Sequence, residues 1–177
     1  VRYFNGPLFR MKPEIVLKDD EVTLLWEACQ HGWQNVRPEI FGALFESTQT
    51  KKARHKDGMH FTSEEDILKV IRPCIIDPWE KAVQRCKTMD DFRQIHRKLK
   101  SYRVLDPACG SGNFLVVAYR ELKKIEERIF TSYKKLSGES YNEVQQILGW
   151  MPVTNMYGIE INAFPSFLSR VSLWITK

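Results

Sequence analysis

The sequence predicts an α/β protein in which a mostly helical N-terminal half is followed by the start of a parallel sheet. Apolar residues recur with helical spacing through most of the first hundred residues. The run at 102–108 is short, apolar and broken by a proline, which is consistent with a buried parallel strand. A helix pattern, a second short apolar run and a last helix pattern come after it. Strands that alternate with helices in this way indicate a parallel sheet.

Helix signals mark five segments of the first hundred residues. In the third segment either Thr62 or Ser63 can cap the helix, because an acid follows each of them three residues later. Pro73 should end this helix or start the next turn. The fifth segment has Thr88 as its expected N-cap. The five segments are 18–32, 37–48, 60–73, 77–86 and 88–100.

The second part of the chain should contain two strands and three helices. The strands are expected at 102–108 and 155–161, and a long helix should begin at Asn113. A short added helix is expected between Ser140 and Gly149, which supply a capping residue and a stop signal. The last helix, at 162–175, should present one apolar face made of Phe164, Leu168, Val171 and Ile175.

Composition and charge are those of an ordinary globular protein with a basic excess. The chain has 177 residues, 43% of them hydrophobic, and a formal net charge of +5. No apolar run is long enough for a membrane span, so we expect a cytoplasmic protein and no membrane partner. The four cysteines form no C-x-x-C pair, which predicts no metal site and four reduced thiols, three of them packed in apolar surroundings. The basic run 81–103 suits either a polyanion or a solvated helix face.

The segment "VLDPACGSGNFL", residues 104–115, reads as a strand, a glycine turn and a helix start. A phosphate-binding loop would need Lys and Ser or Thr after the last glycine, but Asn113 and Phe114 follow instead. The third glycine of a dinucleotide fingerprint is replaced by Leu115. Asp106 would also repel a pyrophosphate. The turn therefore favours a ligand with a positive group and no phosphate, and S-adenosyl-L-methionine is such a ligand.

Three motifs resemble those of the gamma-class N6-adenine DNA methyltransferases. "DPACGSGNFL" is similar to their first motif, "YGIEIN" to their second and "HFTS" to their upstream motif. The resemblance implies that Glu160 holds the ribose hydroxyls of S-adenosyl-L-methionine, that Ile161 packs on its adenine and that Thr62 meets its carboxylate. It also implies a Rossmann-like class I methyltransferase fold, incomplete in this chain. The implied cofactor-binding residues are Phe61, Thr62, Asp106, Pro107, Ala108, Cys109, Gly110, Ser111, Gly112, Asn113, Phe114, Glu160 and Ile161.

The segments "FNGPLF", "IFGALFE" and "RVSLWI" resemble the large single-chain restriction-modification enzymes called type IIG or IIL. The resemblance implies a helical connector over 1–57 and the N-terminal part of a methyltransferase domain over 58–177. The sequence separation between Asp106 and Glu160 is larger than the ~20 residues of a compact dinucleotide-binding unit. The short helix expected between Ser140 and Gly149 accounts for the difference. The family's catalytic motif, Asn or Asp followed by Pro-Pro and an aromatic residue, is absent, so no catalytic residue is assigned.

The expected function is the cofactor-binding portion of a DNA adenine-N6 methyltransferase from a restriction-modification enzyme, which binds double-stranded DNA through the full-length protein. Two alternatives are a fragment of an RNA or protein-glutamine methyltransferase and a helical docking module without catalytic activity. The chain alone should transfer no methyl group and should bind cofactor weakly at best. An exposed strand edge should favour its self-association.

Overall fold

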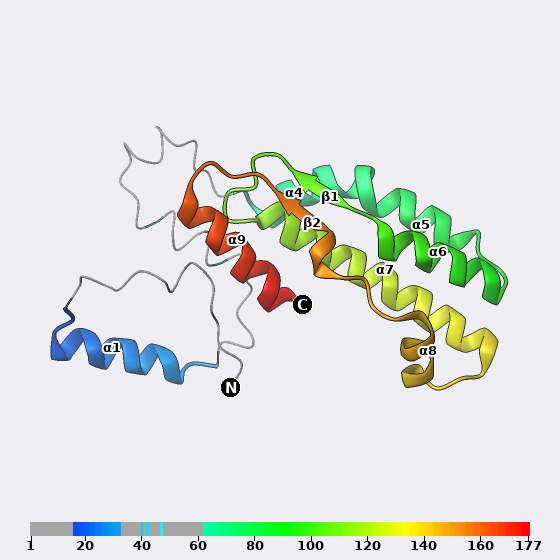
Figure 1. The fold of residues 1–177 in the computed structure, drawn as a ribbon, viewed down its shortest axis with the longest axis horizontal. Helices are drawn as coiled ribbons and strands as arrows, with labels where there is room; N and C mark the ends of the chain where they lie inside the picture. The colour runs from blue at the N-terminus through cyan, green and yellow to red at the C-terminus, as the bar shows by residue number, and fades with distance from the viewer. Residues whose placement is uncertain (1–15, 33–39, 41, 43–46, 48–61) are drawn as a thin grey trace.

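The computed structural model describes residues 16–32, 40, 42, 47 and 62–177, and these form a mostly helical structure with a two-stranded parallel sheet. The long helix α7 runs through the middle, with β1 and β2 on one side of it and α8 near its C-terminal end (Figure 1). The elements are α1 (Asp19–Gln30), α4 (Glu64–Ile71), η3 (Arg72–Ile76), α5 (Asp77–Gln84), α6 (Met89–Ser101), β1 (Val104–Asp106), α7 (Asn113–Ser137), α8 (Tyr141–Leu148), η4 (Val153–Asn155), β2 (Met156–Gly158) and α9 (Ala163–Thr176).

Of the two predictions for Pro73, the structure follows the second: α4 ends at Ile71, and Pro73 lies in the first turn of the π-helical segment η3. Pro73 has no backbone N–H to donate to the preceding turn. The wider π turn of η3 absorbs this loss, and the backbone N–H of Asp77 donates to the carbonyl of Arg72. As a result α4, η3 and α5 follow one another directly, with no loop between the helices predicted at 60–73 and 77–86.

The two strands pair in parallel, as the sequence predicts, but each is only three residues long. Val104 pairs with Met156, Leu105 with Tyr157 and Asp106 with Gly158. Helix α7 packs on one face of this pair. Leu105 is 60% exposed and its neighbour Tyr157 is 46% exposed, so among the described residues the other face is bare.

The core lies along α7, which has twelve buried residues over its 25. Its helical period places Leu115, Leu122 and Ile129 on one inward face, where each is almost fully buried. Helices α4, α6, α8 and α9 all pack against it. The added helix α8 begins and ends as predicted, because Ser140 and Glu143 form a capping box and Gly149 follows the last turn with a φ of 70°.

The face that α9 buries agrees with the predicted one only in part. Leu168 is buried and Val171 is half-buried, as predicted, but Phe164 and Ile175 are exposed. The small residues Ser169 and Ser172 are buried instead. The reason is steric: a Cβ placed on Gly112 would lie 2.7 Å from the Ser169 Cβ. The backbone of the turn comes so close to α9 that only small side chains fit between them.

None of the described helices is long and apolar enough to cross a membrane. The prediction that three cysteines are packed is wrong, since Cys29 and Cys74 are exposed, Cys86 is half-buried and only Cys109 is buried.

Helix α1 buries none of its residues against the described part of the chain.

Candidate cofactor site at the glycine turn

The backbone of the segment 106–113 makes a tight turn between β1 and α7. Gly110 and Gly112 have φ values of 52° and 86°, in the left-handed region that glycine adopts without strain. The N–H of Gly112 donates to the carbonyl of Cys109 at 2.7 Å, and Gly112 then serves as the N-cap of α7. The predicted strand, glycine turn and helix start are therefore confirmed.

Glu160 lies against this turn although 50 residues separate it from Gly110. Its Oε2 accepts a hydrogen bond from the Gly110 N–H at 3.0 Å, and its Oε1 accepts one from the Asn162 N–H at 2.7 Å. Backbone bonds from Ile159 N–H to Asp106 carbonyl (2.9 Å) and from Cys109 N–H to Ile159 carbonyl (3.0 Å) continue the strand pairing past β1 and β2. The structure thus joins two of the predicted motifs.

Asp106 stands at the carboxyl end of β1. Its Oδ1 accepts a hydrogen bond from the Ala108 N–H at 3.0 Å, which sets the direction of the chain after the strand. Both Asp106 and Glu160 are half-buried, so solvent or a ligand can reach them. In parallel sheets, ligands bind beyond the carboxyl ends of the strands. The two carboxylates give this edge a negative potential.

Cys109 is buried inside the turn and carries no reactive thiolate. Burial raises the pKa of its thiol, and the nearby carboxylates of Asp106 and Glu160 raise it further. A thiol with a raised pKa is protonated at neutral pH and is a poor nucleophile. The sulfur instead packs against the backbone of β2: a Cβ on Gly158 would lie 2.5 Å from it.

Space for a ligand opens beside Gly110. A Cβ added there would have no described heavy atom within 4 Å, apart from its own chain neighbours. At Gly112 and Gly158 the same test finds atoms at 2.7 Å and 2.5 Å. Two glycines therefore allow close packing within the protein, and the third leaves its backbone accessible from outside.

The remaining predicted residues are distributed around the turn. Pro107 and Ala108 are exposed, Ser111 and Phe114 are half-buried and Asn113 is buried. Ile161 is 96% exposed, so in the described residues nothing packs on it. Pro107, Ala108 and Phe114 also line a cleft of about 290 Å³ between η3 and β1.

The upstream motif is described only in part. Phe61 lies outside the described residues. Thr62 is half-buried, but it is not the cap of α4: the N-cap is Ser63, whose Oγ accepts from the Asp66 N–H at 3.2 Å. An ion pair between Glu64 and Arg120 ties the first turn of this helix to α7.

Two residues at the turn were missed by the sequence reasoning. Gly42 lies so close that an added Cβ would collide with the Ser111 Oγ, and Ser169 of α9 packs on Gly112. Both are small residues in apolar segments. Their size was the available signal, because a small residue among large ones often marks a close approach of two backbones.

Comparisons with known proteins agree with this arrangement. The family model described as "MmeI, DNA-methyltransferase domain" matches residues 80–177, which is more than half of the chain. DNA methyltransferase A of Bacillus subtilis (strain 168) is 32% identical over 180 residues, covering 99% of this chain and 20% of that protein. A putative type II restriction enzyme and methyltransferase of Methanocaldococcus jannaschii is 24% identical, covering 99% of this chain and 18% of that protein.

A solved structure gives the same result in three dimensions. The type IIL restriction-modification enzyme MmeI, in complex with DNA, superimposes with a TM-score of 0.82 and 34% sequence identity, over 97% of this chain and 23% of that one. The chain spans about a fifth of the length of the curated relatives it matches. Motifs, fold and comparisons together lead to one conclusion: the chain belongs to the family of the MmeI DNA-methyltransferase domain.

Proposed function

We propose that this chain is the S-adenosyl-L-methionine-binding portion of a DNA adenine-N6 methyltransferase in a restriction-modification enzyme. The carrying observation is that the Glu160 carboxylate binds the backbone of the glycine turn, at the carboxyl ends of two parallel strands. Family membership supports the reaction class, and the relatives named as restriction-modification enzymes support the setting. The full-length protein would bind double-stranded DNA, and the superimposed enzyme, which is in complex with DNA, supports a DNA partner.

The residues at the turn fit this cofactor. Asp106 and Glu160 place two carboxylates where an ammonium and a pair of ribose hydroxyls would be held, and carboxylates accept hydrogen bonds from both groups. The open space at Gly110 allows the cofactor to approach the backbone. Because Ile161 is exposed beside Glu160, it offers an apolar surface for the adenine. When bound, the cofactor supplies an electrophilic methyl group on its sulfonium.

The chain's own part in catalysis is to bind and orient. Glu160 would hold the ribose while it keeps the turn closed through Gly110 and Asn162. The low reactivity of Cys109 leaves the thiol out of the chemistry. We assign extrusion of the target adenine from the duplex, and acceptance of hydrogen bonds from its amine, to the Asn/Asp-Pro-Pro-aromatic motif that this sequence lacks.

The proposal includes a fold, a domain division and a compartment. The strand–helix–strand–helix order over 104–176 supports the start of a Rossmann-like class I methyltransferase fold. The division into 1–57 and 58–177 falls outside the described residues and stays a prediction. Four free cysteines support a cytoplasmic location.

Calorimetric titration of the full-length protein with S-adenosyl-L-methionine tests the site. We expect Asp106→Asn to weaken binding at least about tenfold, because a hydrogen bond to a charged group contributes roughly 1.5–3 kcal/mol. Asp90→Asn is the matched control, since Asp90 is exposed on α6 and binds only Gln94 in the described structure. If Asp106→Asn and wild type bind the cofactor equally well, the assignment of the pocket is wrong.

A further inference from the structure

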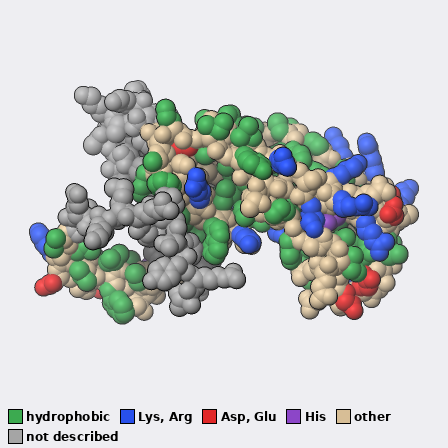
Figure 2. Space-filling model, in the orientation of Figure 1, with side chains coloured by type: hydrophobic (Ala, Val, Ile, Leu, Met, Phe, Trp, Pro, Cys, Tyr) green, Lys and Arg blue, Asp and Glu red, His purple; other side chains and the backbone are tan. Residues whose placement is uncertain are grey.

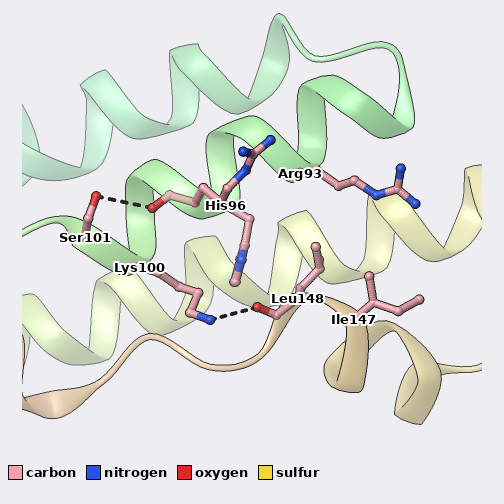
Figure 3. A pocket seen from close by; sticks show the side chains of 7 residues that line it. Arg93, His96, Lys100, Ser101, Ile147 and Leu148 are labelled. Atoms are coloured by element: carbon pink, nitrogen blue, oxygen red, sulfur yellow. Dashed lines mark hydrogen bonds between the residues drawn. The ribbon is translucent and has the colours of Figure 1, made fainter.

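A basic groove lies between α6 and α8, far from the glycine turn. It encloses about 650 Å³ and is lined by Arg93, His96, Arg97, Lys100, Ser101, Ile147 and Leu148. In Figure 3, Lys100 reaches from α6 to α8 and Arg93 extends over α7. Figure 2 shows that Lys and Arg side chains gather at this end of the molecule.

The cations of the groove come from one stripe of α6. Arg93, Arg97 and Lys100 follow one another at spacings of four and three residues, which puts them on the same side of the helix. The adjacent stripe, which includes His96 and Leu99, is buried against α7. The amphipathic pattern of α6 therefore displays three cations along the edge of the core.

None of the described residues that line the groove carries a carboxylate. Arg93 lies over the ring of Tyr133 at 5.4 Å, and Lys100 Nζ donates to the carbonyl of Leu148 at 3.1 Å. Behind the wall of the groove, the buried carboxylate of Glu126 is engaged by His96 and Lys123. Among the described residues the positive charge of this surface is thus not neutralised by acids that line it.

The groove is held in a fixed shape. Glu126 Oε1 contacts His96 Nε2 at 3.1 Å and accepts from the Met151 N–H at 2.6 Å, so one buried carboxylate joins α6, α7 and the segment after α8. Asn155 donates to the carbonyl of Lys100 at 2.7 Å. A pre-shaped surface loses less conformational entropy when it binds a ligand.

We propose that this groove binds the sugar-phosphate backbone of double-stranded DNA, at a contact separate from the methyl-transfer pocket. Arg and Lys side chains are the usual partners of phosphates, and here no acid that lines the groove neutralises them. Exposed Lys98 and Arg103 flank the stripe, and a patch broader than one phosphate favours a polyanion over a single anion. The choice of DNA rests on the proposed function, whereas the groove itself does not.

The groove lies at the opposite end of the sheet from the turn. It is built at the C-terminal part of α6, just before β1, whereas the turn follows β1. Along α7 the distance from Asn113 to Glu126 is about 20 Å at 1.5 Å per residue. DNA held here is therefore a different stretch from the base pair whose adenine receives the methyl group.

Fluorescence anisotropy with a labelled duplex of about 20 base pairs, titrated at several salt concentrations, tests this contact. We expect the double variant Arg93→Gln, Arg97→Gln to weaken binding about tenfold and to lower the slope of log affinity against log salt by about two. The matched control is Lys81→Gln, Arg85→Gln, which removes two exposed cations, one in α5 and one at its C-cap, that do not line the groove. The control should change affinity less than about twofold if binding is localised to the groove.

Further variants and control ligands separate DNA binding by the groove from misfolding and from binding of any anion. Arg97→Glu, at an exposed position, should weaken DNA binding without lowering the melting temperature, which guards against misfolding caused by loss of the Arg93 contact. The DNA titrations are run without S-adenosyl-L-methionine, so failure of the cofactor proposal is separable from failure of this one. Equal losses in groove and control variants, or equally tight binding of poly-glutamate or of inorganic phosphate, would overturn the proposal.

Discussion

The two ends of α7 are built by different means. At its N-terminal end the backbone makes the structure: two glycines with positive φ, a carboxylate bound to N–H groups and strands of three residues. Toward its C-terminal end side chains make it. There Phe130 packs against the rings of His96, Tyr141 and Trp150, with ring centroids 5.3, 6.1 and 5.0 Å away. The comparison teaches that the candidate cofactor site depends on backbone geometry at one end of α7, whereas side-chain packing holds the other end.

The largest expected effect is at the packed end. Glu126 is fully buried and His96 is 1% exposed, so Glu126→Gln removes the charge from a buried network of His96 and Lys123. Breaking a buried pair destabilises by about 3 kcal/mol. Urea unfolding followed by circular dichroism measures this. Glu121→Gln, in a more exposed pair with Lys124, is the control and should change stability by less than about 1 kcal/mol.

Glu126 also makes the stability of the fold depend on pH in the acid range. Burial alone would raise the pKa of Glu126, but hydrogen bonds from His96 and Lys123 outweigh it and the net pKa is lowered. A carboxyl with a lowered pKa in the folded state stabilises the fold above its unfolded pKa of about 4.3, and this is lost as the pH falls through the folded value. Wild type should therefore lose more stability than Glu126→Gln below about pH 4.3. Parallel acid unfolding curves would contradict this.

A smaller effect separates the two caps of α7. Gly112 and Gly138 both have positive φ, but a Cβ meets Ser169 only at Gly112 and no described atom within 4 Å at Gly138. Gly138→Ala should destabilise by about 1 kcal/mol through backbone strain alone, and Gly112→Ala by about 2–3 kcal/mol because a clash is added. Thermal melts of the two variants measure the difference. Equal shifts would mean that α9 does not press on the turn as described.

The smallest effect concerns the bare sheet face at the glycine end. Leu105 and Tyr157 stand side by side on it, and exposed apolar patches of this kind favour association. Sedimentation of the 177-residue chain should show weak self-association that Leu105→Lys reduces. An Ile147→Lys variant, at an exposed position of α8, should leave it unchanged. A wild-type chain that sediments as a monomer at every concentration would contradict the prediction.

Local signals were enough for most elements and for the turn. The capping box of α8, the helical period of α7 and the glycines of the turn all act within a few residues of themselves, so the sequence predicts them. Motif resemblance implied that Glu160 and Gly110 both belong to the cofactor site. The contact between them is a finding of the structure, and the role of either residue toward a cofactor stays a prediction.

What the sequence could not supply depends on tertiary contact. His96 and Glu126 lie 30 residues apart on two helices, and neither has a local pattern that marks a partner. The buried face of α9 depends on where the turn presses on it, which amphipathic periodicity does not reveal. At Pro73 the chain had two solutions, a break or a π turn, and packing of η3 against α7 accompanies the second.

One chemically identical change at each end tests the central claim most directly. Glu160→Gln and Glu126→Gln are compared in the full-length protein for S-adenosyl-L-methionine affinity by calorimetry and for stability by urea unfolding. We predict that Glu160→Gln lowers cofactor affinity about tenfold and changes stability by less than about 1 kcal/mol. We predict that Glu126→Gln lowers stability by about 3 kcal/mol and leaves cofactor affinity unchanged. Unchanged cofactor affinity in Glu160→Gln would contradict the account.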